Sequence, residues 1–407
     1  MEPKIKISDY TYILPEERIA KYPLEKRDNS KLLIYNKGII EEKRFYDIPS
    51  YLPDNSLMVF NNTKVVPARL FFRKESGALI EIFCLEPYSP ADYATAFASK
   101  GSSEWNVVIG NAKRWKNGCI YFNCSDSDTK AKSLNLRALL IEKDGVSGSV
   151  VRFLWDGDFV FSEVLDICGR IPIPPYLKRE TESLDVERYQ TLYAKINGSV
   201  AAPTAGLHFT DAVLDAIDKR SISRRNVCLH VGAGTFVPVK SEYIADHKMH
   251  TEPFNVELQL LKDIYNLTDK EKVIAVGTTS ARSLESIYYL GAHCMENGEP
   301  GVVTQWEPYN KVRNYTLKES LGALIRYMES RNITSFMART GIIILPGYSF
   351  KVVDVLITNF HQPQSTLLLL IAAFTGGEQW KRIYDYAMGH DFRFLSYGDS
   401  SLLFREE

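Results

Sequence analysis

Six short stretches of alternating apolar residues decide the fold of the central region: RLFFR (69–73), LIEIFCLEP (79–87), WNVVIG (105–110), CIYFNC (119–124), LRALLIE (136–142) and VVRFLW (150–155). A period of two is typical of strands that bury one face, and Gly, Ser, Asn and Asp lie between the stretches. Short strands at this spacing predict a small antiparallel barrel or sandwich.

The sequence on both sides of this region has a different character. Helical patterns alternate there with short buried runs: DAVLDAIDKR (211–220), KVIAV (272–276), TTSARSLESIYYLG (278–291), GIIIL (341–345) and DVLITNF (354–360). This alternation indicates an α/β layer. We therefore predict an α/β fold, in which an α/β layered domain (1–61 and 158–407) is interrupted by an inserted small antiparallel β-barrel domain (62–157).

The composition is that of a soluble enzyme, with 407 residues, 45% hydrophobic residues and a formal net charge of −1. No apolar run reaches the ~18–20 residues of a membrane span, and the N-terminus lacks a signal-peptide pattern, so we expect a cytoplasmic protein and no membrane partner. The six cysteines form no C-x-x-C pair, which argues against a zinc site or a disulfide framework. A near-neutral charge argues against a general polyanion binder, although a local basic face suffices for nucleic acid.

Two segments rich in Gly and Ala each carry a histidine: GSVAAPTAGLHFT (198–210) with His208, and NVCLHVGAGTFVPVK (226–240) with His230. Gly and Ala allow backbone amides to approach a ligand closely. The alternative is that small residues merely permit tight packing. Two such segments close together favour a binding site.

Four further segments carry polar groups at places suited to chemistry. Thr278–Ser280 follow a predicted strand and either cap the next helix or turn its amides toward an anion. Asn359 and His361 end an apolar strand ahead of Ser365 and Thr366, where ligands of α/β proteins bind, and this favours a site over a core histidine. The last two segments are FRFLSYGDSSLLF (392–404), a predicted strand with Arg393, Tyr397 and Asp399, and DHKMHTEPF (246–254), with His247, His250 and Glu252. A metal site at the latter lacks a supporting H-E-x-x-H helix.

Several known motifs fail on inspection. LHVGAGTF (229–236) imitates the glycine turn of common methyltransferases, but Phe-Val-Pro-Val follows it rather than a helix. P-loop, G-x-S-x-G and kinase signatures are absent from the sequence. Lys113, Arg114 and Lys116 cluster beside Trp115, either as a phosphate-contacting patch or as a solvated hairpin tip.

Taken together, nine segments closely resemble the S-adenosylmethionine:tRNA ribosyltransferase-isomerases of queuosine biosynthesis. They are YILPEERIAKYPLEKRDNSKLLI (12–34), FNNTKVVPARL (60–70), GRIPIPPYLKR (169–179), DVERYQTLYAKINGSVAAPTAGLHFT (185–210), HVGAGTFVPVK (230–240), HKMHTEPF (247–254), VIAVGTTSARSLES (273–286), PGYSFKVVDVLITNFHQPQSTLLLLIAAFTG (346–376) and FRFLSYGD (392–399). The resemblance runs nearly end to end. The family fold is likewise an α/β domain with an inserted six-stranded antiparallel barrel.

The resemblance implies an enzyme that uses S-adenosylmethionine as a co-substrate and donor of a ribosyl group. The acceptor is 7-aminomethyl-7-deazaguanine at the wobble position of a tRNA, and the products are epoxyqueuosine in tRNA, adenine and methionine. A base must remove a proton beside the sulfonium, and adenine must be protonated as it leaves. Two alternatives stay open: a methyltransferase that uses S-adenosylmethionine, and a catalytically inactive tRNA-binding homologue.

Site residues follow from this chemistry. The expected catalytic groups are His208, His230 and His361, which titrate near neutrality, and Asp399 as an orienting carboxylate. The expected substrate-binding residues are Thr204, Gly232, Gly234, Thr235, Phe236, His250, Glu252, Thr278, Thr279, Arg282, Asn359, Ser365, Thr366 and Tyr397. Phe236 and Tyr397 would pack on the sulfonium or adenine, and Arg282 would bind a carboxylate or phosphate. The expected tRNA contacts are Lys64, Arg69, Lys113, Arg114 and Lys116. No metal and no obligate protein partner is expected.

Three departures from the family pattern stand out. Asn62 and Lys64 replace the usual Asp and Arg, and Lys lacks the bidentate fork of Arg. Gln362 and Gln364 replace the usual Leu and Lys. The segment 294–340 matches the family poorly and is interpreted either as a rim element, such as a lid or tRNA contact, or as a plain surface insertion.

Overall fold

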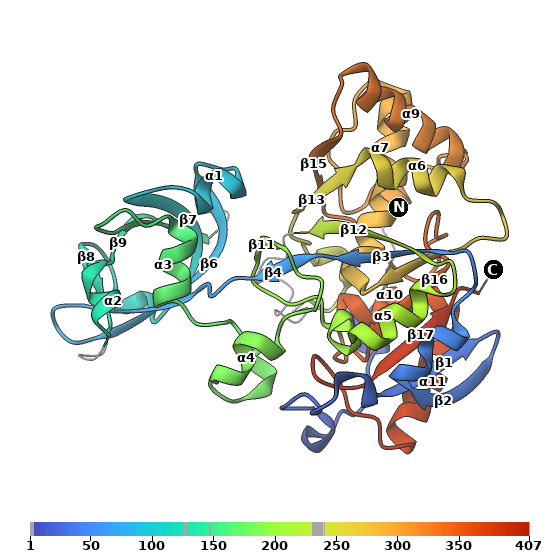
Figure 1. Ribbon diagram of the computed structural model, residues 1–407, viewed down its shortest axis with the longest axis horizontal. Helices are drawn as coiled ribbons and strands as arrows, with labels where there is room; N and C mark the ends of the chain where they lie inside the picture. The colour runs from blue at the N-terminus through green and yellow to red at the C-terminus, as the bar shows by residue number, and fades with distance from the viewer. Residues whose placement is uncertain (1–3, 125–127, 146–147, 230–238, 240, 407) are drawn as a thin grey trace.

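The computed structural model describes residues 4–124, 128–145, 148–229, 239 and 241–406. The molecule is elongated, with a barrel on one side of a large mixed sheet (Figure 1). This arrangement confirms the predicted α/β fold with a small antiparallel β-barrel.

The large sheet has nine strands in the order β15-β13-β12-β3-β14-β16-β17-β1-β2. Their bounds are β1 (Lys31–Asn36), β2 (Ile39–Arg44), β3 (Leu57–Asn61), β12 (Ser223–Leu229), β13 (Glu252–Glu257), β14 (Val273–Val276), β15 (Ser335–Thr340), β16 (Val355–Asn359) and β17 (Ser400–Phe404). The four central strands β12, β3, β14 and β16 run parallel to one another. β13 and β17 flank them in the antiparallel direction.

Helices cover both faces of this sheet, so its central strands are apolar throughout. Along β3, Leu57 and Val59 contribute to the core under α7, whereas Met58 and Phe60 contribute to the opposite core under α5, as the period of a strand requires. The helices are α5 (Asp211–Asp218), α6 (Leu258–Asn266), α7 (Thr278–Asn297), α8 (Glu307–Asn310), α9 (Leu317–Ser330), α10 (Thr366–Thr375) and α11 (Gln379–Gly389).

The barrel is closed in the order β10-β7-β6-β5-β8-β9, and every pairing in it is antiparallel. Its elements are β5 (Arg69–Arg73), β6 (Leu79–Ser89), β7 (Ser102–Gly110), β8 (Cys119–Phe122), β9 (Arg137–Gly145) and β10 (Gly148–Leu154), with α1 (Tyr93–Phe97), α2 (Thr129–Ser133) and α3 (Phe161–Cys168). Ile80, Ile82 and Cys84 alternate into its core, and Phe161 of α3 packs on Trp105 and Trp155. The alternation in the sequence thus produces the inner and outer surfaces.

A small two-stranded sheet lies between the barrel and the large sheet (Figure 1). It consists of β4 (Thr63–Val65) and β11 (Ile196–Ser199), which run parallel, and α4 (Ser183–Arg188) precedes β11. β4 belongs to the predicted insertion yet pairs outside it, and the division at residues 62 and 157 stays a prediction. Short 3-10 helices complete the chain: η1 (Ile7–Asp9), η2 (Glu16–Arg18), η3 (Arg27–Asn29), η4 (Phe45–Tyr51), η5 (Ala112–Arg114), η6 (Pro175–Leu177), η7 (Thr204–His208) and η9 (Ile244–Asp246).

Two strand predictions were wrong. Residues 341–345 form no strand, although Ile342–Leu345 are buried. β15 ends at Thr340, and beyond it the backbone makes only isolated hydrogen bonds to the 303–305 segment, Gly341 N to Val303 O and Ile343 N to Gln305 O, rather than a continuous ladder. Residues 392–399 form a loop held by its own polar contacts, and only Ser400–Phe404 form the late strand β17.

Candidate active site

The four parallel strands end at one edge of the large sheet, with Asn61, Leu229, Val276 and Asn359 as their last residues. Ligands of open α/β sheets bind beyond this carboxyl edge. η7 lies against β16 there, and Ala205 approaches Gly277 at the start of α7. The predicted segments around His208, Thr278 and Asn359 therefore meet at this edge.

His208 is buried at this edge, with 4% of its surface exposed. Its Nδ1 lies 2.7 Å from Ser30 Oγ, its Nε2 lies 3.3 Å from Asn359 Nδ2, and its ring stacks on Phe45. Burial, followed by the nearby charge of Arg393, lowers the pKa of His208 to about 3, so the ring is neutral at pH 7. Both nitrogens are occupied within the protein, which suits a positioning residue better than an acid or base.

Asn359 has unused hydrogen-bonding capacity. Its Nδ2 donates to Leu395 O at 3.0 Å and faces His208 Nε2, which assigns the other amide atom as oxygen. That Oδ1 is buried and has no hydrogen-bond partner among the residues that the structure describes. A buried acceptor without a partner costs about 1–3 kcal/mol, which a donor on a bound ligand would recover.

His361 is the more accessible of the two described candidate catalytic histidines, because its side chain is only partly buried. Two tyrosines fix its backbone: Tyr12 OH donates to its carbonyl at 2.5 Å, and its amide donates to Tyr384 OH at 3.0 Å. Its Nε2 lies 3.0 Å from Thr358 Oγ1. Burial lowers the pKa of His361 to about 4, so the imidazole is neutral at pH 7 and is a weaker base than an exposed histidine.

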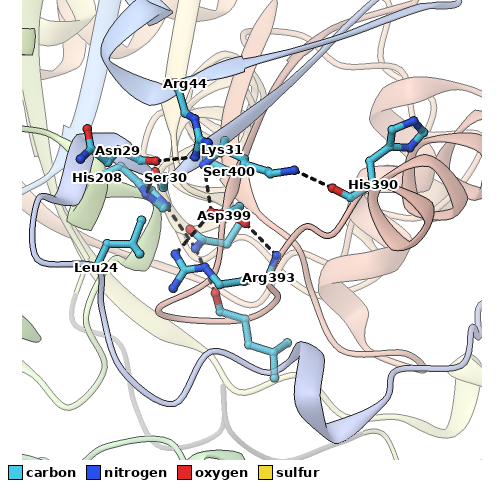
Figure 2. A network of polar contacts seen from close by, with 12 residues as sticks. Leu24, Asn29, Ser30, Lys31, Arg44, His208, His390, Arg393, Asp399 and Ser400 are labelled. Carbon is cyan, nitrogen blue, oxygen red and sulfur yellow. Dashed lines mark hydrogen bonds and ion pairs between the residues drawn. The ribbon is translucent and has the colours of Figure 1, made fainter.

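Asp399 holds together the loop that precedes β17 (Figure 2). Its carboxylate accepts the amides of Lys31 at 2.9 Å and Arg393 at 2.7 Å, and it forms an ion pair with the Arg393 guanidinium at 3.3 Å. These contacts satisfy the carboxylate within the protein. Asp399 therefore positions Arg393, a residue that the sequence singled out without assigning a role.

Tyr397 makes its contacts inside the protein. It is buried, its hydroxyl donates to Asp185 at 2.8 Å, and Asp185 in turn binds Arg179 through two 2.7 Å hydrogen bonds. The Tyr397 ring packs edge-on against Tyr189. These contacts fill both its polar and its apolar surface, so the described geometry gives it a packing role rather than contact with adenine.

Arg282 forms a buried ion pair across the same edge. Its Nη1 lies 2.9 Å from Glu252 Oε2, and its Nε donates to Ile342 O at 3.2 Å. Its Nη2 is buried and has no acceptor within the described part of the chain. An arginine with two committed nitrogens and one uncommitted nitrogen is suited to bind a carboxylate or phosphate oxygen through the third.

The N-terminus of α7 differs from the prediction. Gly277, at φ 92°, is the N-cap, and no side chain caps the helix. Thr278 is buried and Thr279 half-buried in the first turn, and Ser280 Oγ donates back to Val276 O at 2.8 Å. Of the two interpretations of Thr278–Ser280, the capping role is therefore wrong, because the N-cap position has a positive φ that glycine, here Gly277, accommodates best.

The remaining candidates at this edge vary in exposure. Thr204 is half-buried in η7, and His250 is exposed. Ser365 caps α10 by accepting the Leu368 amide, and Thr366 is the first helical residue. Five candidates lie outside the described residues: His230, Gly232, Gly234, Thr235 and Phe236.

The predicted tRNA contacts fall on two surfaces. Lys113, Arg114 and Lys116 are exposed near the connection between β7 and β8, while Trp115 between them is fully buried in the barrel core. Lys64 is exposed on β4, and Arg69 at the start of β5 forms an ion pair with Glu81.

Across the described ranges, no three His, Cys, Asp or Glu side chains are grouped as metal ligands. Within the same part of the chain, no helix is both long enough and apolar enough to cross a membrane.

Comparison with known proteins decides the family. The family model described as queuosine biosynthesis protein matches residues 7–403. The chain belongs to this family. A curated relative from Thermoanaerobacter sp. (strain X514), named S-adenosylmethionine:tRNA ribosyltransferase-isomerase, is 39% identical over 404 residues, covering 98% of this chain and 100% of the relative. A relative of the same name from Halothermothrix orenii is 38% identical over 403 residues, covering 98% and 100%.

A solved member of this family gives a similar match in length. It is the crystal structure of S-adenosylmethionine tRNA ribosyltransferase from Thermotoga maritima, with 25% identity, a TM-score of 0.46, and coverage of 97% of this chain and 100% of that chain.

Proposed function

We infer that this protein is an S-adenosylmethionine:tRNA ribosyltransferase-isomerase. The observation that carries the inference is the family match, which spans residues 7–403, together with two curated relatives aligned over their entire lengths. The protein transfers and isomerises the ribosyl moiety of S-adenosylmethionine onto 7-aminomethyl-7-deazaguanine in tRNA. Epoxyqueuosine in tRNA, adenine and methionine are the products. A tRNA substrate supports the expected cytoplasmic location.

His361 is our candidate for the base that removes the proton beside the sulfonium. Its half-buried ring is neutral at pH 7, and the two tyrosine contacts to its backbone fix its place. His208 acts one step away, by holding Asn359 and Ser30. The proposal that His230 protonates adenine rests on the sequence alone.

Arg282 and Asn359 are our candidates for substrate recognition. The uncommitted Arg282 Nη2 suits the methionine carboxylate, and the unpaired Asn359 Oδ1 suits a donor on the ribose or the deazaguanine. Ligand binding satisfies both atoms, which is a physical reason for them to be buried without partners.

The decisive experiment supplies the full-length protein with S-adenosylmethionine and a tRNA that carries 7-aminomethyl-7-deazaguanine. Mass spectrometry of nucleosides and small molecules should detect epoxyqueuosine, adenine and methionine. S-adenosylhomocysteine would instead indicate a methyltransferase, and tRNA binding without product would indicate an inactive homologue. His361→Gln should abolish adenine release, whereas the matched control His390→Gln, at an exposed position, should not.

A further inference from the structure

Four basic residues lie along the junction between the barrel and the large sheet: Lys64, Arg69, Arg170 and Lys195. We name this set the junction belt. Lys64 lies on β4 and Lys195 directly precedes β11. Arg69 and Arg170 face each other where the chain enters and leaves the barrel, because their backbones exchange hydrogen bonds of 3.2 and 2.8 Å.

The junction belt is continuous with the candidate active site. Asn62 links β3 to β4, and its carbonyl accepts the Lys195 amide at 2.8 Å. Lys64 opposes Asn197 in the β4–β11 register, and β11 leads into η7, which ends at His208. Figure 1 shows β4 and β11 between the barrel and the sheet. A ligand group at the carboxyl edge therefore has the belt beside it.

Three of the four belt charges have no ion-pair partner among the described residues. Lys64, Arg170 and Lys195 are exposed, and among the residues with described placement no carboxylate forms an ion pair with any of the three. The guanidinium carbons of Arg69 and Arg170 lie 5.2 and 5.0 Å from the centroid of the same ring, Phe71. Because Glu81 pairs with Arg69, Arg170 is the cation on this ring that is available to a bound anion.

We propose that the junction belt binds the phosphate backbone of the anticodon arm beside the modified nucleotide. This inference rests on the proposed function, because a wobble base at the carboxyl edge brings its neighbouring phosphates to the adjoining surface. Lys64 and Lys195 neutralise phosphates as point charges, and Arg170 offers a bidentate fork. The basic cluster at residues 113–116 is less suited to this contact, because β7 runs from Ser102 toward it, away from the end of the barrel that joins the sheet.

A triple variant of the full-length protein tests the proposal: Lys64→Gln, Arg170→Gln and Lys195→Gln. Its matched control is Lys219→Gln, Lys270→Gln and Lys318→Gln, which removes the same charge from three exposed lysines elsewhere. Filter binding gives the Kd for tRNA at about 50 and about 200 mM KCl. Each phosphate contact adds a factor of roughly three to the loss of tRNA affinity over this rise in salt. Calorimetry with S-adenosylmethionine verifies the fold of each variant.

We expect the belt variant to bind tRNA at least about ten-fold more weakly at low salt, and to lose about 30-fold less affinity than the wild type when salt is raised. The control should match the wild type in both respects. A belt variant with the wild-type Kd and salt slope, or a control that weakens equally, would overturn the proposal. Turnover of S-adenosylmethionine is measured separately. A wild type that binds tRNA without forming product would contradict the proposed function. The binding data would still test whether the junction belt contacts tRNA.

Lys64→Gln and Lys195→Gln alone provide a second test if the triple variant folds poorly, since both side chains are exposed. Each single change should reduce the salt dependence of the tRNA affinity by the amount expected for about one phosphate contact. Unchanged slopes in both single variants would also overturn the proposal.

Discussion

The carboxyl edge of the large sheet and the interior of the barrel differ in the polar atoms that they bury. At the edge, Asn359 Oδ1 and Arg282 Nη2 are buried without partners in the described structure. The barrel core is a continuous apolar cluster built on Phe72, Trp105 and Trp115. Unsatisfied polar atoms lower stability unless a ligand pairs with them, whereas a closed apolar core favours folding. This difference agrees with our proposal that substrate binds at the edge, while the barrel supplies a rigid apolar core.

The largest effect is expected at Arg282. Arg282→Gln leaves Glu252 buried without its cation, which should lower the free energy of unfolding by about 3–5 kcal/mol. It also removes the nitrogen proposed to bind substrate, so S-adenosylmethionine binding should be lost. Chemical denaturation and calorimetry measure the two effects.

The double variant Arg282→Gln/Glu252→Gln separates these effects. It should recover most of the stability, because neither charge is left uncompensated, yet it should still fail to bind S-adenosylmethionine. Wild-type binding by the double variant would show that Arg282 serves the fold alone.

Trp115→Ala should lower stability without affecting catalysis, because it changes the barrel core and leaves the carboxyl edge intact. Trp115 is fully buried, and its indole donates to Gly118 O at 3.2 Å. The cavity should lower the stability of the barrel by about 3–5 kcal/mol, without changing kcat well below the unfolding temperature. Lys130→Ala, at an exposed position on α2, is the control and should change neither quantity measurably. A reduced kcat in folded Trp115→Ala would show that the barrel core shapes the active site.

The same contrast explains how far the sequence could predict the structure. The alternation of Ile80, Ile82 and Cys84 is a local signal, and it correctly predicted barrel strands. The buried runs that end at Val276 and Asn359 are equally local, and they placed polar residues at one edge. Period and burial therefore predicted the fold.

The roles of individual side chains depend on partners that are remote in sequence. Ser30 and Asn359, which occupy His208, are 178 and 151 positions away from it. Asp185, which takes the Tyr397 hydroxyl, is 212 positions away. No local sequence signal distinguishes a histidine that contacts substrate from one held inside such a network. The sequence could therefore identify these residues as candidates but could not assign their roles.

Asn359→Ala tests whether the unpaired atom at the edge serves the reaction. Removal of Oδ1 should lower kcat/KM about 10- to 100-fold, the range for one lost hydrogen bond to a reacting or charged group. Steady-state rates of adenine release measure the change. A rate equal to that of the wild type would remove Asn359 from the site.

His208→Gln distinguishes positioning from proton transfer at the same edge. Glutamine can still bond to Ser30 and Asn359, so a positioning role predicts a reduced rate with an unchanged pH profile. If a limb of the pH profile disappeared, His208 itself would be a proton carrier.

The smallest effect is expected at His293, on α7 far along the helix from the edge. Its Nδ1 lies 2.6 Å from Pro300 O and its Nε2 2.5 Å from Glu307 Oε1, so both nitrogens face acceptors, as an imidazolium requires. The hydrogen bond to Glu307 raises the pKa of His293, against opposition from burial and from Arg313, which also binds Glu307.

Because the folded-state pKa of His293 is raised, its stabilisation is complete below the ordinary histidine pKa and declines as pH rises through the folded-state value. The melting temperature of the wild type should therefore fall relative to His293→Gln, by about 2 °C, as pH rises from slightly acidic to alkaline. His390→Gln controls for loss of an exposed imidazole. Parallel melting curves for the wild type and His293→Gln would show that the ring is neutral in the fold, while unchanged kcat in His293→Gln would keep this network separate from the chemistry at the edge.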